Sequence, residues 1–159
     1  MRKIRGFKLA LRASEVKRRA RKAGLDLEAM GLDETGLHKL LAQASRSIMA
    51  GVLFDTFKLP DADAAALSPI PGLAYSVILA TLGPAFPLAK ERSRESSAET
   101  HALWDLMEAA ALDEAVRFAA ALLDEEAAKE CCALSPWNVL SEPAALEAVL
   151  RKLGGAKID

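Results

Sequence analysis

The chain has few of the residues that build covalent or metal-bound centres. Its 159 residues include only two cysteines, Cys131 and Cys132, which are adjacent. Neighbouring cysteines rarely form a disulfide, because the bridge is strained at that spacing. Free thiols fit a reducing compartment, so the sequence predicts a cytoplasmic protein. We expect two buried, structural thiols rather than a redox pair, since a thiolate at the end of the preceding helix would face the negative end of its dipole.

Motifs that bind nucleotides or metals are also missing. The sequence contains no Walker loop, no dinucleotide glycine pattern, no HExxH and no paired CxxC, which argues against triphosphate hydrolysis and a structural zinc site. One of the two histidines, His101, lies four residues before Asp105, so the two side chains could share a helix face. They could hold a metal there or form a surface hydrogen bond, and we expect the hydrogen bond. His38 falls outside the apolar stripe of its helix and is expected to be exposed.

Long apolar runs and aromatic residues are scarce. No stretch approaches the roughly 20 apolar residues that span a bilayer, so we expect no membrane partner. Charges interrupt residues 4–11, which therefore do not form the core of a signal peptide. Aromatic residues make up 5% of a chain that is 52% hydrophobic, so the core must be mainly aliphatic. The length suits a single domain over residues 1–159 that needs no disulfide or metal to fold.

Charge is distributed unevenly along the chain. In residues 1–23, ten basic residues stand against the single acidic Glu15, a net of +9 in a chain whose total is −1. Five of them fall on one predicted helix: Lys17, Arg18, Arg19, Arg21 and Lys22. Such a patch can bind a nucleic acid or an acidic protein. No aromatic residue after Phe7 interleaves with it, so base stacking is not indicated. The alternative is an acidic partner within the same fold.

The first half of the chain predicts alternating strands and helices. Residues 4–12 alternate apolar with polar or small side chains, as in a half-buried strand. Ser14 is expected to cap a helix that runs to about Ala23, and Gly24 suits its end. A second helix begins at Asp33, carries a leucine-rich stripe to Ile48 and ends by Gly51. Residues 52–57 alternate again and predict a strand.

A connector rich in proline, residues 58–72, leads to the strongest strand candidate. It is expected to hold at most one helical turn. Residues 73–82, LAYSVILATL, are nearly all apolar, as in a strand buried on both faces. A helix follows from about Phe86.

The second half of the chain is predominantly helical. Ser96 and Glu99 have the spacing of a capping box and open an alanine-rich helix that runs to about Glu130, with a kink near Asp113 as an alternative to one straight helix. Ser141 and Pro143 suit the start of the last helix, and Gly154 suits its end. The sum predicts an α+β fold, a helix-rich single domain with a small sheet. The alternative is an all-α bundle, because each predicted strand is short.

Two further features bear on chemistry. Carboxylates gather on the long helix: Asp105, Glu108, Asp113, Glu114, Asp124, Glu125 and Glu126. A small hydrolase would need two of them in one cleft with different pKa values, and we expect a solvated face instead. The turn Thr81-Leu82-Gly83-Pro84 joins a buried strand to a helix, where free amides attract anions. Such turns also need glycine for steric reasons alone.

The order of these elements resembles a known family. The stretch YSVILATLGPAF, the long alanine-rich helix and the stretch LSPWNVLSEPAALEAVLRKLG are similar to the reactivation domain of cobalamin-dependent methionine synthase and its stand-alone relatives. The resemblance covers most of the chain. Where the family has an arginine and a proline-glycine-tyrosine stretch, this chain reads CCALSPWNVL.

This resemblance implies a function. The family has an α+β fold, and its methionine synthase member binds S-adenosylmethionine to remethylate oxidised cobalamin. By this resemblance the chain would be an accessory domain for a corrinoid or methyltransferase protein, with S-adenosylmethionine as ligand near Thr81, Gly83 and Pro84. A related domain that keeps only the partner role would fit equally well. The alternative is an interaction module that binds an acidic protein or nucleic acid through the basic segment.

Overall fold

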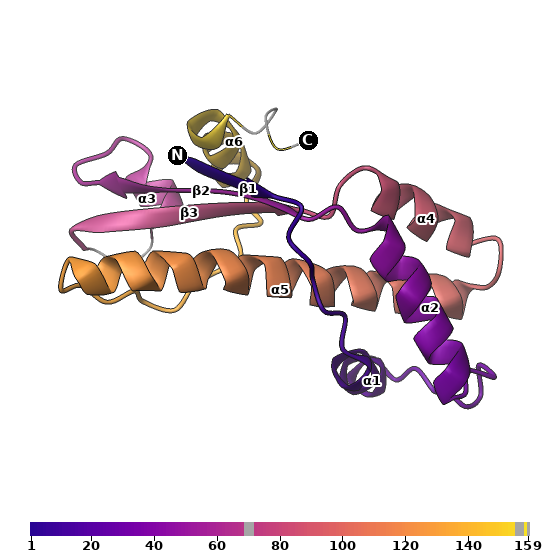
Figure 1. The fold of residues 1–159 in the computed structure, drawn as a ribbon. Coiled ribbons are helices and arrows are strands. Elements are labelled where there is room, and N and C mark those ends of the chain that lie inside the picture. Colours follow the sequence, from indigo (N-terminus) through magenta and orange to yellow (C-terminus); the bar gives the residue numbers. More distant parts are fainter. Residues whose placement is uncertain (69–71, 155–157, 159) are drawn as a thin grey trace.

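A computed structural model describes residues 1–68, 72–154 and 158 of the chain and has a helix-rich α+β fold (Figure 1). Over these residues, six helices accompany one three-stranded antiparallel sheet. The predicted fold class is therefore confirmed, and the all-α alternative is wrong. The predicted connector 58–72 is described except for residues 69–71. Its described part contains one short helix, α3 (Ala64–Leu67), which agrees with the prediction of at most one helical turn.

The sheet has the order β1-β2-β3, with β2 (Gly51–Lys58) in the centre. Its neighbours are β1 (Arg2–Arg5) and β3 (Ala74–Thr81), and both pairings are antiparallel. The strands predicted at 52–57 and 73–82 are thus confirmed. The burial on both faces that was predicted for residues 73–82 is wrong, because β3 lies at an edge of the sheet. Only Tyr75 and Val77 of β3 are fully buried, whereas the first four residues of β2 are all buried.

The strand predicted over residues 4–12 is wrong for most of its length. The chain leaves the sheet at Gly6, which has φ of +68° and donates its amide hydrogen to the Ala50 carbonyl oxygen at 3.0 Å. The alternating apolar residues that follow pack on helices instead. Phe7 stacks on Phe118 with ring centroids 4.4 Å apart. Burial on one side is needed in either environment, so alternation alone did not distinguish a strand from an extended segment lying across a helix.

Helices cover both faces of the sheet. Figure 1 shows α3 and α6 (Pro143–Leu153) on one face and α5 (Ala98–Lys129) on the other. Leu53 and Val77 pack against Val149 and Leu153 of α6. On the opposite face, side chains of β2 meet small residues of α5, and the buried members of this cluster are Val52, Phe54, Ala115, Ala119 and Leu123. The alanines bring the axis of α5 close to the sheet, and α5 runs without a break through Asp113.

A second, all-helical core lies beyond the end of the sheet. It is formed by α1 (Ala13–Lys22), α2 (Glu34–Ser47) and α4 (Ala85–Ser93), packed around the N-terminal half of α5 (Figure 1). Phe86 and Trp104 meet there with ring centroids 5.4 Å apart. The long helix α5 therefore belongs to both cores. None of the helices in the described ranges combines the length and apolarity needed to cross a bilayer.

Several helix ends lie where capping residues, glycine and proline in the sequence predicted them. Asp33 caps α2 by accepting a hydrogen bond from the Gly36 amide at 2.6 Å. Gly24 follows the end of α1 with φ of +74°, Pro143 begins α6, and Gly154 ends it in the left-handed region.

Other predicted ends shift by one to four residues. α1 begins at Ala13 after Arg12, so Ser14 is not its cap, and α6 is preceded by Glu142 rather than Ser141. α2 ends at Ser47, and Gly51 instead begins β2. The cap of α5 is Ser97, which accepts from the Thr100 amide at 3.0 Å. Ser96 still belongs to the turn that ends α4, because its amide bonds to the Ser93 carbonyl oxygen.

Candidate functional site

The turn at Thr81, Gly83 and Pro84 joins β3 to α4, as predicted, and its glycine has a structural task. Gly83 is buried with φ of +80°, and its amide donates to Oγ1 of Thr81 at 3.1 Å. A Cβ on Gly83 would lie 2.9 Å from Cβ of Met49. The Met49 amide in turn donates to the Leu82 carbonyl oxygen at 2.8 Å. The turn therefore brings two backbone segments together, and the Gly83 amide is already occupied.

The predicted basic patch is partly neutralised within the fold. Lys17 reaches Glu34 at 3.4 Å, and Arg18 reaches Glu15 at 2.7 Å. Arg19 bridges Glu15, at 2.7 Å, and Asp113 of α5. The hydrogen bonds from Arg18 and Arg19 lower the pKa of Glu15 to about 2.

The two remaining members of the patch, Arg21 and Lys22, are exposed on α1. Neither forms an ion pair with any of the described residues. The expected acidic partner within the same fold is thus confirmed for three members of the patch. Arg21 and Lys22 are not paired within the described residues, and binding of an external partner stays a prediction.

A groove of about 560 Å³ lies between the C-terminal end of α1 and the start of α2. This volume is in the range of small-molecule sites. Lys17 and Arg21 contribute positive charge to it. Its acidic side chains are Asp26, Glu28, Asp33 and Glu34, and its apolar lining comes from Leu25, Leu27, Leu32 and Leu37. Sequence reasoning missed this groove, although leucines and acidic residues alternate in residues 25–28, between two predicted helices.

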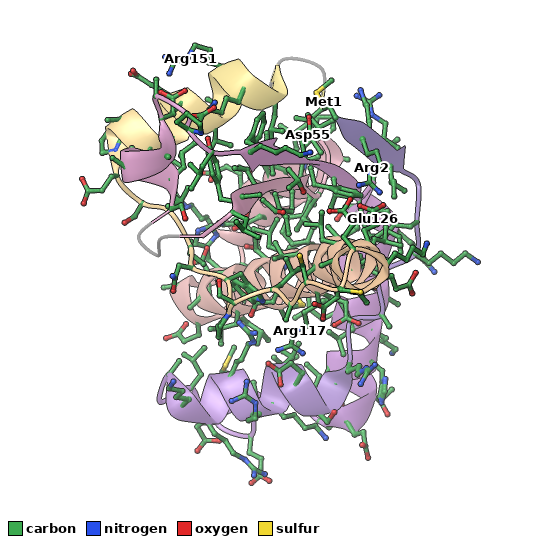
Figure 2. All side chains as sticks on the ribbon, turned by 90° about the vertical axis from the view of Figure 1, so that its left-hand side faces the viewer. Met1, Arg2, Asp55, Arg117, Glu126 and Arg151 are labelled. Atoms are coloured by element: carbon green, nitrogen blue, oxygen red, sulfur yellow. The ribbon has the colours of Figure 1, made fainter. Side chains whose placement is uncertain are left out.

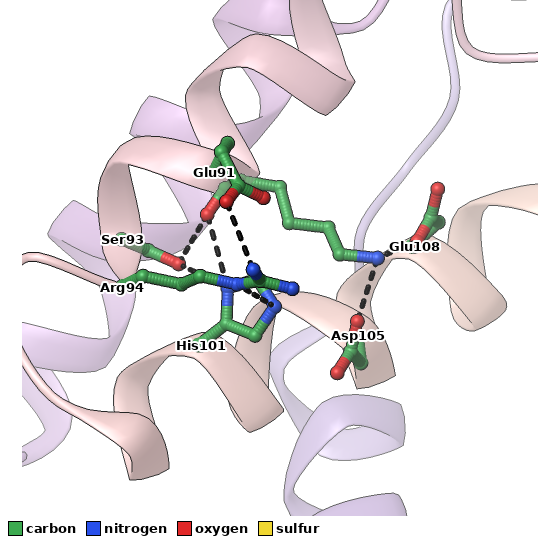
Figure 3. A network of polar contacts seen from close by, with 7 residues as sticks. Glu91, Ser93, Arg94, His101, Asp105 and Glu108 are labelled. Carbon is green, nitrogen blue, oxygen red and sulfur yellow. Dashed lines mark hydrogen bonds and ion pairs between the residues drawn. The ribbon is translucent and has the colours of Figure 1, made fainter.

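His101 belongs to a polar network that joins α4 to α5 (Figure 3). Nε of Arg94 donates to Nε2 of His101 at 3.2 Å, so Nε2 carries no proton and Nδ1 does. Nδ1 faces Oγ of the buried Ser93 at 3.1 Å and the Lys90 carbonyl oxygen at 3.2 Å. Ser93 itself donates to that carbonyl at 2.5 Å. The serine proton therefore points away from the imidazole, and this arrangement does not activate Ser93 as a nucleophile.

The predicted hydrogen bond between His101 and Asp105 is absent from this network. Asp105 instead pairs with Lys90 at 2.6 Å, and Glu108 pairs with the same ammonium at 2.5 Å. These two carboxylates raise the pKa of Lys90. Throughout residues 1–68 and 72–154, no three histidine, cysteine or acidic side chains gather in a way that could hold a metal ion. His38 is exposed, as expected.

The acidic stretch of α5 does not form a catalytic carboxylate pair. Four of its seven members form ion pairs with cations of other elements: Asp105 and Glu108 share Lys90, Asp113 pairs with Arg19, and Figure 2 shows Glu126 beside Arg2 of β1. Asp124 and Glu125 are exposed. The expected solvated face is therefore found only at some of these carboxylates, because others form salt bridges that connect α5 to α1, α4 and β1.

The two cysteines are exposed to solvent, whereas the sequence predicted that they are buried. Cys131 and Cys132 are both exposed, just after the end of α5, so the expected burial is wrong. The apolar face of α5 ends with Leu123, and the chain after Lys129 leaves the protein interior.

A second polar cluster, not indicated by the sequence, fastens α6 to the connector after β2. Nζ of Lys152 lies 2.8 Å from Asp61 and 4.6 Å from the ring centre of Phe57. The Tyr75 hydroxyl donates to the same carboxylate at 2.8 Å. The hydrogen bonds from Lys152 and Tyr75 lower the pKa of Asp61 to about 2, and burial raises the pKa of Tyr75. All these groups are paired, so the cluster is structural.

Comparison of the chain with protein-family models, with curated proteins and with solved structures finds no match.

Proposed function

We propose that this chain is an accessory domain for corrinoid or methyl-transfer proteins, which acts by docking to a partner and has S-adenosylmethionine as its candidate ligand. The observation that carries the proposal is the apolar surface at the end of the chain. Nine large apolar side chains are exposed among the described residues, and five of them lie between residues 134 and 150: Leu134, Trp137, Val139, Leu146 and Leu150. These five side chains lie within 17 consecutive residues, and Leu146 and Leu150 share one stripe of α6. Exposed apolar side chains that share a surface are typical of docking sites.

The apolar stripe of the last helix is wider than the part that the fold covers. Its inner part, with Val149 and Leu153, packs on the sheet. Leu146 and Leu150 lie one turn apart at the edge of this stripe and are 43% and 48% exposed. The segment that leads into this helix carries Trp137, which is 46% exposed. A partner that covers Leu146 and Leu150 would remove from water the apolar surface that the fold itself leaves open.

The methyl-transfer assignment rests on the order of the elements. The strand β3, its turn, the helices α4 and α5 and the final α6 are the elements that carry the resemblance, and they follow one another in the expected order. The candidate catalytic groups are engaged in structural contacts, as for Ser93 and His101. A binding role therefore fits the chain better than a reaction of its own.

The groove between α1 and α2 supports S-adenosylmethionine as the ligand. The molecule carries one carboxylate and two cationic groups, an ammonium and a sulfonium. Arg21 offers a free positive charge for the carboxylate, and Glu28 offers a negative charge for a cationic group. The turn at Thr81 lies apart from the lining of this groove, so the two places make different predictions.

Calorimetric titration with S-adenosylmethionine at low salt tests the ligand. We expect saturable binding, and a concentration one hundred times Kd should add about 2.7 kcal/mol to the stability of the native state. If the groove binds the ligand, Arg21→Ala and Glu28→Gln weaken binding while Thr81→Ala does not. The reverse pattern would place the ligand at the turn. A flat titration of the wild-type protein would remove S-adenosylmethionine from the proposal.

Docking is tested separately with a corrinoid-loaded methyltransferase protein as the partner. In a Trp104→Phe variant, Trp137 is the only tryptophan, and its fluorescence should shift to shorter wavelength as the complex forms. Leu146→Ser and Leu150→Ser should each weaken the complex at least tenfold. Leu88→Ser is the matched control, because Leu88 is 63% exposed on α4, away from this surface. Equal losses for Leu88 and Leu150 would contradict the assignment of the surface.

A second candidate function follows from the free charges on α1. Arg21 and Lys22 remain available to an acidic protein or a nucleic acid. Binding of this kind should weaken steeply with salt, and the double variant Arg21→Ala/Lys22→Ala should flatten that dependence. Lys39→Ala is the matched control, because Lys39 is also exposed but lies on α2. Binding that does not respond to salt would exclude this function.

A further inference from the structure

The C-terminal end of α5 presents two adjacent thiols to solvent. Cys131 and Cys132 are free and exposed, and each residue from 133 to 139 is exposed as well. They are the only cysteines of the chain. Both residues are exposed with respect to all of the described residues, so a dissolved reagent or ion can reach the pair.

The backbone at this position favours glycine rather than cysteine. The Cys132 amide donates to the Ala127 carbonyl oxygen at 2.8 Å, and the Cys131 amide donates to the Ala128 carbonyl oxygen at 3.1 Å. These two bonds are those of a Schellman motif, which ends a helix with a residue in the left-handed region. Cys131 occupies that position with φ of +56°.

Cys131 is the exception among such positions. In the described ranges, the other five residues with positive φ are all glycines: Gly6, Gly24, Gly31, Gly83 and Gly154. A side chain in this region is conformationally unfavourable. The packing of the core does not require the cysteine either, because its side chain lies in solvent. A function for the thiol would account for a cysteine at a place where glycine is the more stable residue.

Adjacent thiols are better placed to chelate one centre than to form a disulfide with each other. Cα atoms joined by a trans peptide are roughly 3.8 Å apart, which is shorter than the separation of about 4.4–6.8 Å found in disulfides. Direct oxidation to a disulfide would therefore strain the chain. One atom inserted between the two sulfurs lengthens the bridge by a second bond and relieves that constraint. The pair is therefore better suited to chelate a single centre than to form a bond with itself.

The surroundings restrict which centre the pair can hold. A zinc site needs four ligands, and the described residues contain no group of three or more histidine, cysteine or acidic side chains placed to share an ion. Soft centres are different, because they bind thiolates in preference to harder ligands and accept as few as two. Monovalent copper and trivalent arsenic belong to this class.

We propose that Cys131 and Cys132 together form a two-thiol site for one soft, thiophilic centre. On binding Cu(I), each thiol releases its proton to solvent and forms one sulfur–copper bond, without a change of oxidation state. With phenylarsine oxide as probe, two thiols and one As=O group give one arsenic dithiolate and one water molecule. The reaction needs no oxidant and no further residue.

The test uses the reduced full-length protein under anaerobic conditions. We expect one phenylarsine oxide adduct per chain by mass spectrometry, which survives an excess of a monothiol. We also expect one Cu(I) to be retained against a chromophoric chelator. Cys131→Ser and Cys132→Ser should each lower both affinities at least tenfold, because a single thiol cannot chelate. Zinc should not be retained by any of the variants.

A third variant separates loss of the site from loss of the fold. Cys131→Gly keeps the helix end in the backbone region that glycine prefers, so its thermal midpoint should rise by about 2–4 °C while binding is lost. Single-cysteine variants that retain wild-type affinity for either probe would overturn the proposal, because the probe would then need only one thiol or another site. The proposal would also be overturned if the wild-type protein bound neither phenylarsine oxide nor Cu(I).

Discussion

Replacement of Gly83 by alanine should destabilise the protein through one backbone contact. Gly83 has φ of +80°, a region that costs a residue with a side chain about 1–2 kcal/mol. The new Cβ would also lie 2.9 Å from Cβ and 3.0 Å from the carbonyl oxygen of Met49. Met49 cannot easily retreat, because its amide is bonded to the Leu82 carbonyl oxygen. Crowding of this kind costs about 1–3 kcal/mol, so the total loss should be about 2–5 kcal/mol.

The matched control is Gly31→Ala. Gly31 has a similar φ of +67°, but no atom lies within 4 Å of an added Cβ. It should therefore lose only the conformational part, about 1–2 kcal/mol. Urea unfolding followed by circular dichroism at 222 nm measures both losses, and each kcal/mol should lower the thermal midpoint by about 2–4 °C. If the two variants lose equal stability, the contact with Met49 is not the reason for a glycine at position 83. The turn would then again be a candidate ligand site.

Three further predictions test the helix ends, the polar cluster on α6 and the helical core. Ser97→Ala should cost about 1 kcal/mol and Ser96→Ala almost nothing in urea unfolding, because only Ser97 caps α5, and equal effects would contradict the observed cap. The pKa of Asp61 is lowered from 3.8 to about 2, so its stabilising contribution is complete above about pH 5 and is lost as the pH falls towards 2. Asp61→Asn should show a shallower loss of stability over that acid range, and an unchanged pH profile would refute the assigned cause. Trp104→Ala should cost about 3–5 kcal/mol, since the indole is 1% exposed in the helical core, and a loss below 1 kcal/mol would mean that the core closes around the cavity.

Several features of the fold were predictable because they depend on neighbours in the chain. Asp33, Pro143 and Gly154 mark helix ends through contacts within a turn or two, and the structure has them as predicted. The two long strands were recognisable from their apolar pattern and their boundaries. The cap of α5 was misplaced by one residue because Ser96 and Ser97 are both suitable caps, and the end of α4 decides between them.

The candidate sites were less predictable because their character depends on residues far apart in the sequence. Arg19 is neutralised by Asp113, 94 positions later, so its charge is not available as the local pattern suggested. Likewise, Asp105 pairs with Lys90 of another helix rather than with His101 on its own. The two cysteines follow an apolar helix, yet they are exposed, because the chain turns away from the sheet after α5.

By itself, the sequence determined the class of fold, the positions of most helices and the absence of nucleotide and zinc motifs, since these follow from composition and from contacts between near neighbours. Only the tertiary structure decided which charges remain free, which carboxylates are paired, where the groove lies and whether the thiols reach solvent. The physical reason is that pairing and burial depend on distances in space between segments such as α1 and α5. Those distances are set by the packing of two cores around one long helix, and no local pattern records them.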